Sequence, residues 1–125
     1  MEFLYTSNAP AAIGPYSQAV RVGDLIYTSG QIALLPDGTM IENDIRKQTI
    51  QVLTNIKNIL QDNRSDLNFV VKTTIFLASM DDFGAVNEIY ADFFGDHKPV
   101  RSTVAVKTLP KNALVEIDCI AKTLN

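Results

Sequence analysis

One arginine and one glutamate stand inside the two apolar segments nearest the C-terminus. Arg101 lies near the start of a segment rich in Val and Thr, and Glu116 lies within Leu114-Val115-Glu116-Ile117. A guanidinium can clamp a small carboxylate through two hydrogen bonds, and a carboxylate can orient or activate a water molecule. We expect the two segments to form a hairpin, in which the pair would hold an anion and a water. The alternatives are an ordinary ion pair at a strand end for Arg101 and an outward-facing strand residue for Glu116.

The single histidine and the single cysteine are placed less favourably for chemistry. His97 precedes Lys98-Pro99 in a polar stretch, which predicts a solvated loop residue. Cys119 alternates with apolar residues, which predicts an inert buried thiol. One residue of each kind is too few for a Cys/His metal site or for an intramolecular disulfide. We therefore expect no metal ion.

The glycines and the charges exclude further classes of protein. The six glycines form no Gly-x-Gly-x-x-Gly motif, no P-loop and no Gly-x-Ser-x-Gly elbow. The chain has 11 Lys and Arg against 14 Asp and Glu, a net charge of −3, so it offers no general field for phosphate backbones or anionic lipids. No run approaches the roughly 20 apolar residues of a membrane span. We expect a cytoplasmic protein with no nucleic-acid or membrane partner.

Hydrophobic spacing predicts the elements that must position Arg101 and Glu116. Strands are expected at residues 18–22, 25–32, 69–78, 100–108 and 114–122, with Gly23-Asp24 as a two-residue hairpin turn. One helix is expected to begin at Asp44 as its N-cap and to end near Asp62. A second helix is expected to begin at Asp81 and to end at Gly95, with Phe83 and Tyr90 on its apolar face.

This order of elements predicts one domain, residues 1–125, of the α+β class. Two amphipathic helices would cover one face of a mixed sheet, and the strand–helix–strand units favour some parallel pairing. The other face would remain open, and a second copy of the chain is the partner that we expect to bury it. A domain of this size has little room for a deep cleft, which favours sites at subunit boundaries.

Seven segments together resemble one family along essentially the whole chain, in its order and length. They are residues 13–19 (IGPYSQA), 28–32 (TSGQI), 44–49 (DIRKQT), 55–57 (NIK), 82–83 (DF) with Asn87, 99–104 (PVRSTV) and 115–117 (VEI). The chain thus resembles the RidA family, the reactive intermediate deaminases, also known as the YjgF-type family.

The resemblance implies a fold, an assembly and an activity. The fold is a chorismate-mutase-like two-layer sandwich, and the assembly is a homotrimer built around packed sheets, with small sites in the clefts between subunits. The activity is that of a 2-iminobutanoate/2-iminopropanoate deaminase. Such an enzyme hydrolyses enamine and imine intermediates from pyridoxal-phosphate-dependent dehydratases to 2-oxo acids and ammonia, and needs no cofactor of its own.

The resemblance also assigns roles to residues of this chain. Arg101 would bind the substrate carboxylate and Glu116 would position or activate water, and both are expected to be catalytic together with Tyr16 of the Gly-Pro-Tyr-Ser segment. The expected substrate-binding residues besides Arg101 are Ser29, Gly30, Asn87 and Thr103.

Some of these positions have simpler readings. Many members carry Cys two residues after the arginine, whereas this chain has Thr103, which favours hydrogen bonding or packing there. Tyr16 could instead anchor its loop, Ser29-Gly30 could be a strand irregularity, and Asn87 could be a core hydrogen-bonding residue.

Two rival functions share the same sequence features. One is a non-catalytic 2-oxo-acid-binding or chaperone-like trimer, which would use the same arginine. The other is a ribonuclease or translation inhibitor, against which the acidic composition and the single loop histidine argue.

Overall fold

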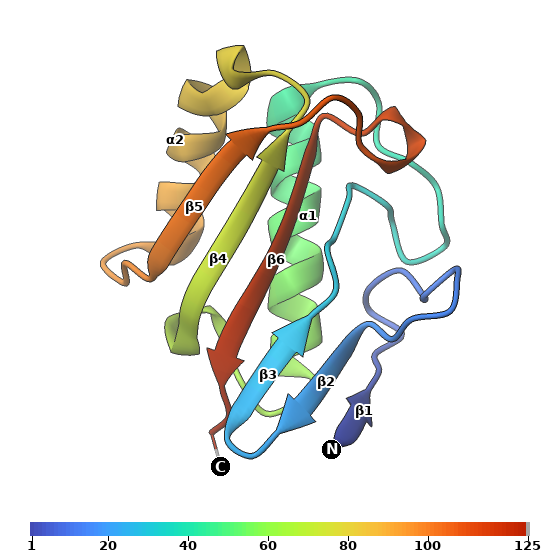
Figure 1. The fold of residues 1–125 in the computed structure, drawn as a ribbon, viewed down its shortest axis with the longest axis vertical. Coiled ribbons are helices and arrows are strands. Elements are labelled where there is room, and N and C mark those ends of the chain that lie inside the picture. The colour runs from blue at the N-terminus through green and yellow to red at the C-terminus, as the bar shows by residue number, and fades with distance from the viewer. Residues whose placement is uncertain (125) are drawn as a thin grey trace.

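The computed structural model describes residues 1–124, and in them a six-stranded mixed sheet carries two α-helices on one face (Figure 1). The expected two-layer α+β architecture is thereby confirmed. The helices are α1 (Ile45–Gln61) and α2 (Phe83–Phe94). The strands are β1 (Glu2–Leu4), β2 (Ala19–Val22), β3 (Leu25–Thr28), β4 (Val70–Leu77), β5 (Val100–Ala105) and β6 (Val115–Lys122).

The strands lie in the order β1-β2-β3-β6-β4-β5. The β4–β5 pair is parallel, joined through α2, and the other neighbouring pairs are antiparallel. The turn at Gly23, whose φ is 60°, joins β2 to β3 as expected. Strand β3 is shorter than expected because its regular pairing with β6 ends at Tyr27. Strand β1 was not expected at all.

The expected hairpin between the strands of Arg101 and Glu116 is wrong. Strand β4 lies between β5 and β6. The chain that links β5 to β6 crosses the end of β4, where the Val106 N–H donates to Leu77 O and the Ala78 N–H donates to Leu114 O. This connection places β6 on the far edge of β4, since the parallel β4–α2–β5 unit already occupies the other edge.

Helix α1 begins as the sequence predicts, and α2 does not. The Asp44 side chain accepts a hydrogen bond from the Lys47 N–H at 3.0 Å and caps α1. At α2, Ser79 instead caps a short 3₁₀ turn, η2 (Met80–Asp82), through the Asp81 N–H, and α2 starts after this turn. The residue before α2 is Asp82, whose side chain makes no capping hydrogen bond, so the expectation that Asp81 caps this helix is wrong.

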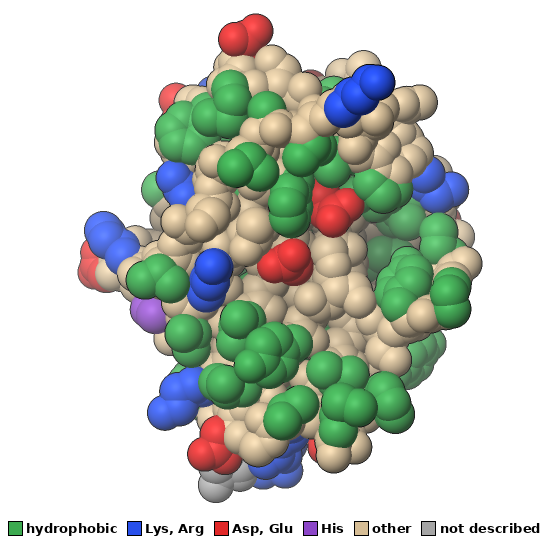
Figure 2. All heavy atoms as spheres, viewed as in Figure 1, with side chains coloured by type: hydrophobic (Ala, Val, Ile, Leu, Met, Phe, Trp, Pro, Cys, Tyr) green, Lys and Arg blue, Asp and Glu red, His purple; other side chains and the backbone are tan. Residues whose placement is uncertain are grey.

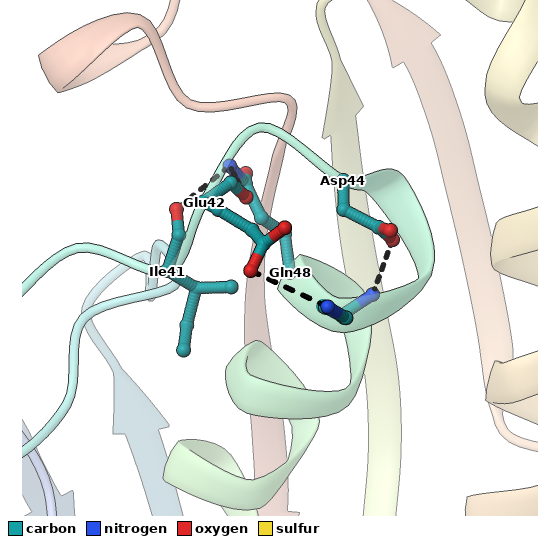
Figure 3. A network of polar contacts seen from close by, with 5 residues as sticks. Ile41, Glu42, Asp44 and Gln48 are labelled. Carbon is teal, nitrogen blue, oxygen red and sulfur yellow. Dashed lines mark hydrogen bonds and ion pairs between the residues drawn. The ribbon is translucent and has the colours of Figure 1, made fainter.

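A buried amide ties the first turn of α1 to the start of β6. The Gln48 side-chain amide donates to the carbonyl oxygens of Ile41 and Glu42, and its oxygen accepts the Leu114 N–H at 2.9 Å. Figure 3 shows Gln48 beneath the loop that carries Ile41 and Glu42. Gln48 therefore fixes the end of β6 from which Glu116 projects.

The core lies between the sheet and the helices. Ile56, Ile59 and Leu60 of α1 belong to one hydrophobic cluster with Val115 and Ile117 of β6, and all are at most 1% exposed. Residues of the opposite parity on each strand face away from the helices.

This open face carries both apolar and charged side chains. Exposed apolar residues include Tyr27, Val100 and Val104, and Glu116 and Asp118 are half-buried among the strands. Figure 2 shows acidic side chains between green apolar groups on this face. No helix within residues 1–124 is long and apolar enough to cross a membrane.

Candidate active site

Arg101 is held against helix α2 by three side chains. Its Nη1 donates to Asn87 Oδ1 at 2.8 Å. Its Cζ lies 5.0 Å from the ring centre of Tyr90 and 5.5 Å from that of Phe83, within cation–π range. Among residues 1–124 no carboxylate lies within ion-pair distance of this guanidinium. The positive charge is therefore fixed in place without being neutralised.

Arg101 and Asn87 line one cavity at the edge of the sheet. This cavity has a volume of about 360 Å³ and is also bordered by Tyr90, His97 and Pro99. A fixed guanidinium beside an amide and aromatic rings can bind a small carboxylate. Arg101, which was expected to bind the substrate carboxylate, and Asn87, which was expected to line the substrate pocket, thus lie together.

Glu116 lies in a second cavity, of about 110 Å³, on the open side of the sheet. Tyr16 and Gly30 line the same cavity, so three of the expected site residues meet here. Burial raises the pKa of the Glu116 carboxyl, and the neighbouring Asp118 carboxylate raises this pKa further. A raised pKa makes the carboxylate a better proton acceptor.

Gly30 leaves room for the Glu116 carboxylate because it has no side chain. A Cβ atom at Gly30 would come within 2.8 Å of Glu116 Cδ and closer still to Oε2. Gly30 follows the point where the pairing of β3 with β6 changes, from Tyr27 opposite Ile120 to an isolated bridge of Gln31 with Ile117. The expected strand irregularity is real, and it is also what admits the carboxylate.

Ser29 and Tyr16 are tied to the loop before β2. The Ser29 hydroxyl donates to Ser17 O at 2.5 Å, and the Tyr16 hydroxyl accepts the Ile13 N–H at 3.4 Å. Both residues border a wider groove of about 620 Å³ on the open face. Tyr16 lines both this groove and the Glu116 cavity, and Ser29 lines the groove.

Thr103 is not brought to either cavity. It faces α2 from β5, beside Ile75 in register. Its Oγ1 is buried and has no hydrogen-bond partner within the described part of the chain. Of the two expected roles, hydrogen bonding or packing, the buried and unpaired hydroxyl agrees with packing inside one copy of the chain.

The two groups of site residues are separated by the sheet. Arg101 contacts α2, so it lies on the helix side. Glu116 stands between Val115 and Ile117, which are buried against the helices, so it points to the opposite side. A single copy therefore does not assemble all the expected residues around one small molecule.

The remaining nucleophile and base candidates are engaged in the structure. His97 lies in the loop between α2 and β5, as expected, but its Nε2 donates to Val70 O at 2.7 Å and its side chain is half-buried, so the expectation of a solvated side chain is wrong. The hydrogen bond to the start of β4 draws the ring inward. Cys119 is 2% exposed, and burial raises the pKa of its thiol to about 12, which confirms an inert thiol. The described residues contain no cluster of three or more His, Cys, Asp or Glu side chains suited to a metal.

Tyr90 and Phe83 are contacts of Arg101 that the sequence pattern assigned to the core. Phe83, Asn87 and Tyr90 stand at positions i, i+4 and i+7 of α2, which places them on one helix face. The signal that could have identified the two aromatic residues is their shared face with Asn87.

Comparisons with known proteins identify the relatives of this chain. A model of the family described as Endoribonuclease L-PSP matches residues 6–123. The chain is 48% identical over 117 residues to the 2-iminobutanoate/2-iminopropanoate deaminase of Mus musculus, covering 93% of this chain and 87% of that protein. It is 48% identical over 121 residues to the chloroplastic Reactive Intermediate Deaminase A of Arabidopsis thaliana, covering 96% of this chain and 65% of that protein.

A solved structure extends the likeness to three dimensions. TdcF of E. coli, determined with bound serine, superposes with a TM-score of 0.93 at 37% identity, covering 98% of each chain. The family match, the two relatives and this structure span nearly the whole of the chain. The chain belongs to the Endoribonuclease L-PSP family, which includes the RidA-type reactive intermediate deaminases.

Proposed function

We propose that this protein is a deaminase that hydrolyses small 2-imino acids, such as 2-iminobutanoate and 2-iminopropanoate, to 2-oxo acids and ammonia. The observation that carries the proposal is the Arg101 guanidinium, anchored by Asn87 and unpaired with any carboxylate of residues 1–124. The names of the mouse and Arabidopsis relatives support this activity, and the serine bound to TdcF supports a small carboxylated ligand.

Arg101 orients the substrate. Its free N–H groups bind the substrate carboxylate in a bidentate pair, which fixes the adjacent C2 carbon. An iminium carbon is already electrophilic, so orientation and delivery of water make up most of the catalysis. This chemistry needs no metal ion and no cofactor of the protein's own.

Glu116 transfers the protons of the reaction. Its carboxylate accepts a proton from the attacking water as the oxygen bonds to C2, and the C=N electron pair moves to nitrogen. The protonated carboxyl then donates this proton to the nitrogen of the carbinolamine. The C–N bond breaks with its electron pair going to nitrogen, the C=O bond of the 2-oxo acid forms, and the hydroxyl proton passes to the departing ammonia, which leaves as ammonium. The raised pKa of Glu116 favours the first step, in which its carboxylate takes the proton from water.

The complete site forms between copies of the chain in this proposal. Arg101 and Asn87 come from one copy, and the neighbouring copy supplies Tyr16, Ser29, Gly30 and Glu116. The exposed apolar residues of the open face, such as Tyr27 and Val100, support association through this face. A homotrimer gives each copy one neighbour on either side and so provides three equivalent sites.

A dehydratase-coupled assay tests the activity. Wild type should accelerate 2-oxo acid formation from the imine that a threonine dehydratase releases, and Arg101→Ala should abolish the acceleration. Full activity in Arg101→Ala, or no effect of wild type, would refute the proposal. Tight binding of 2-oxobutanoate without turnover would instead indicate a binding protein.

Because the family is described as Endoribonuclease L-PSP, the deaminase assay is paired with an assay of RNA cleavage. We expect no RNA cleavage, because the acidic chain offers no basic surface for phosphates. Degradation of RNA by wild type that disappears in Glu116→Gln would identify a nuclease.

A further inference from the structure

Tyr90 links the strand of Arg101, its neighbouring strand and helix α2. Its hydroxyl shares a hydrogen bond of 2.7 Å with Thr73 Oγ1, and its ring centre lies 5.0 Å from Arg101 Cζ. Tyr90 is 9% exposed and Thr73 is 1% exposed. Thr73 is also the register partner of Arg101 across the β4–β5 pair. The hydroxyl of Tyr90 is therefore anchored directly beside the strand position from which Arg101 projects.

The Tyr90 ring is fixed independently of Arg101. Besides the bond to Thr73, the ring packs on Phe94 with ring centres 4.4 Å apart. A long arginine side chain loses much rotamer freedom when it binds an anion, and this loss weakens binding. A fixed aromatic face next to the guanidinium reduces that loss because it holds the side chain near its bound position before the substrate arrives.

The hydrogen bond from Arg101 to Asn87 does not by itself restrain the guanidinium as the Tyr90 ring does. It restrains one nitrogen, Nη1, and leaves the plane of the guanidinium free to rotate about this contact. The rings of Tyr90 and Phe83 supply the surfaces that limit this rotation. Phe83 is half-buried and lacks a polar anchor, whereas Tyr90 is buried and bonded at its far end.

We infer that Tyr90 is a positioning residue, whose Thr73-anchored ring holds the Arg101 guanidinium ready for the substrate carboxylate. The inference rests on the proposed function and adds to it the residue that prepares the carboxylate site. Tyr90 acts through Arg101 and takes no part in the proton transfers.

Aliphatic replacement of Tyr90 tests the role of the ring. Tyr90→Leu should raise the Kd of 2-oxobutanoate, measured by titration calorimetry, by about tenfold, since an unrestrained arginine must be ordered on binding. KM in the coupled assay should rise similarly while kcat changes less than about twofold, as expected for an interaction that contributes equally to the ground and transition states. Tyr90→Met, which fills more of the vacated volume, should show the same split.

Two further variants separate positioning from general stability. Tyr90→Phe keeps the ring and loses the bond to Thr73, so it should bind 2-oxobutanoate within about twofold of wild type although its Tm falls. Ile89→Ala is the matched control, because Ile89 is buried on the same helix and does not line the Arg101 cavity. It should lower the Tm and leave the Kd unchanged.

The outcomes distinguish this inference from the proposed function. Unchanged Kd values in Tyr90→Leu or Tyr90→Met would overturn the positioning role, and so would equal weakening in Tyr90→Phe or in Ile89→Ala. Absence of both 2-oxobutanoate binding and imine hydrolysis in wild type would overturn the proposed function itself.

Discussion

The side chains of Arg101 and Glu116 lie on opposite faces of one sheet, with strand β4 between their strands. Neighbouring strands are about 4.8 Å apart, so the two backbones are separated by about 10 Å before the opposite directions of the side chains are added. A four-carbon imino acid does not span this arrangement. The proposed chemistry therefore depends on a second copy of the chain.

The contact between Gly30 and Glu116 gives the first prediction. Gly30→Ala should lower kcat/KM by about a hundredfold, because the added Cβ displaces the carboxylate from its place beside the backbone. The coupled dehydratase assay measures this loss, and circular dichroism verifies the fold.

Gly84→Ala is the control for that substitution. Gly84 lies in α2, and a Cβ atom added there would meet only open space. The variant should gain up to about 1 kcal/mol of helix stability with unchanged activity. An active Gly30→Ala protein would show that the position of Glu116 is unimportant for turnover.

Asn87 gives a prediction about charge. Asn87→Asp should weaken binding of 2-oxobutanoate more than Asn87→Ala does, because an aspartate would pair with Arg101 and compete with the ligand carboxylate. Asn87→Ala removes one hydrogen bond and should raise the Kd by about fivefold. Calorimetric titration of both variants at one pH decides the order, and tighter binding by Asn87→Asp would contradict a carboxylate site at Arg101.

The pH dependence of stability provides a third prediction. Burial raises the pKa of Glu116 in the folded chain, so the folded state holds this proton more tightly than the unfolded state does. The contribution of Glu116 to the free energy of unfolding should therefore fall as pH rises from about 4 through the folded pKa.

Glu116→Gln removes this titration. The free energy of unfolding, measured with urea from acid to neutral pH, should fall less steeply with rising pH for the variant than for wild type. Asp118→Asn should act in the same direction, because burial also raises the pKa of Asp118. Parallel stability curves for wild type and Glu116→Gln would contradict the burial of this carboxylate.

The Gln48 network supports a fourth prediction, about stability. Gln48→Met should lower the free energy of unfolding by about 2 kcal/mol, since the partly buried Leu114 N–H and two carbonyl groups lose their partner. Lys47→Met breaks an exposed ion pair with Glu42 and should cost less than about 0.5 kcal/mol. Equal losses in the two variants, measured by urea unfolding, would contradict a special role of the amide.

The sequence predicts the elements of this fold better than their pairing. Hydrophobic periodicity placed both helices and the strands of the core within a few residues, because burial on one face leaves a regular pattern. The prediction of a β5–β6 hairpin was wrong because hydrophobic periodicity does not determine which strands are neighbours in the sheet. That choice depends on the crossover through α2 and on the link that passes the end of β4.

The candidate site was predictable in its residue types and not in its geometry. Arg101 with Asn87, and Glu116 with Tyr16 and Gly30, do share cavities. Their division between two faces follows from strand order and parity, which no local segment contains. Tyr90 was assigned to the core because a buried aromatic residue on a helical stripe usually packs there, and its second contact depends on tertiary structure.

The most direct test of the two-copy site is complementation between two inactive variants. Arg101→Ala and Glu116→Gln chains, carrying different affinity tags, are co-expressed, and mixed assemblies are purified through both tags. If one copy supplies Arg101 and its neighbour Glu116, some sites in a mixed assembly contain both residues. In a trimer that contains both variants, one of the three sites is complete, which restores roughly a third of wild-type deaminase activity. Mixed assemblies as inactive as either parent would contradict a site shared between copies.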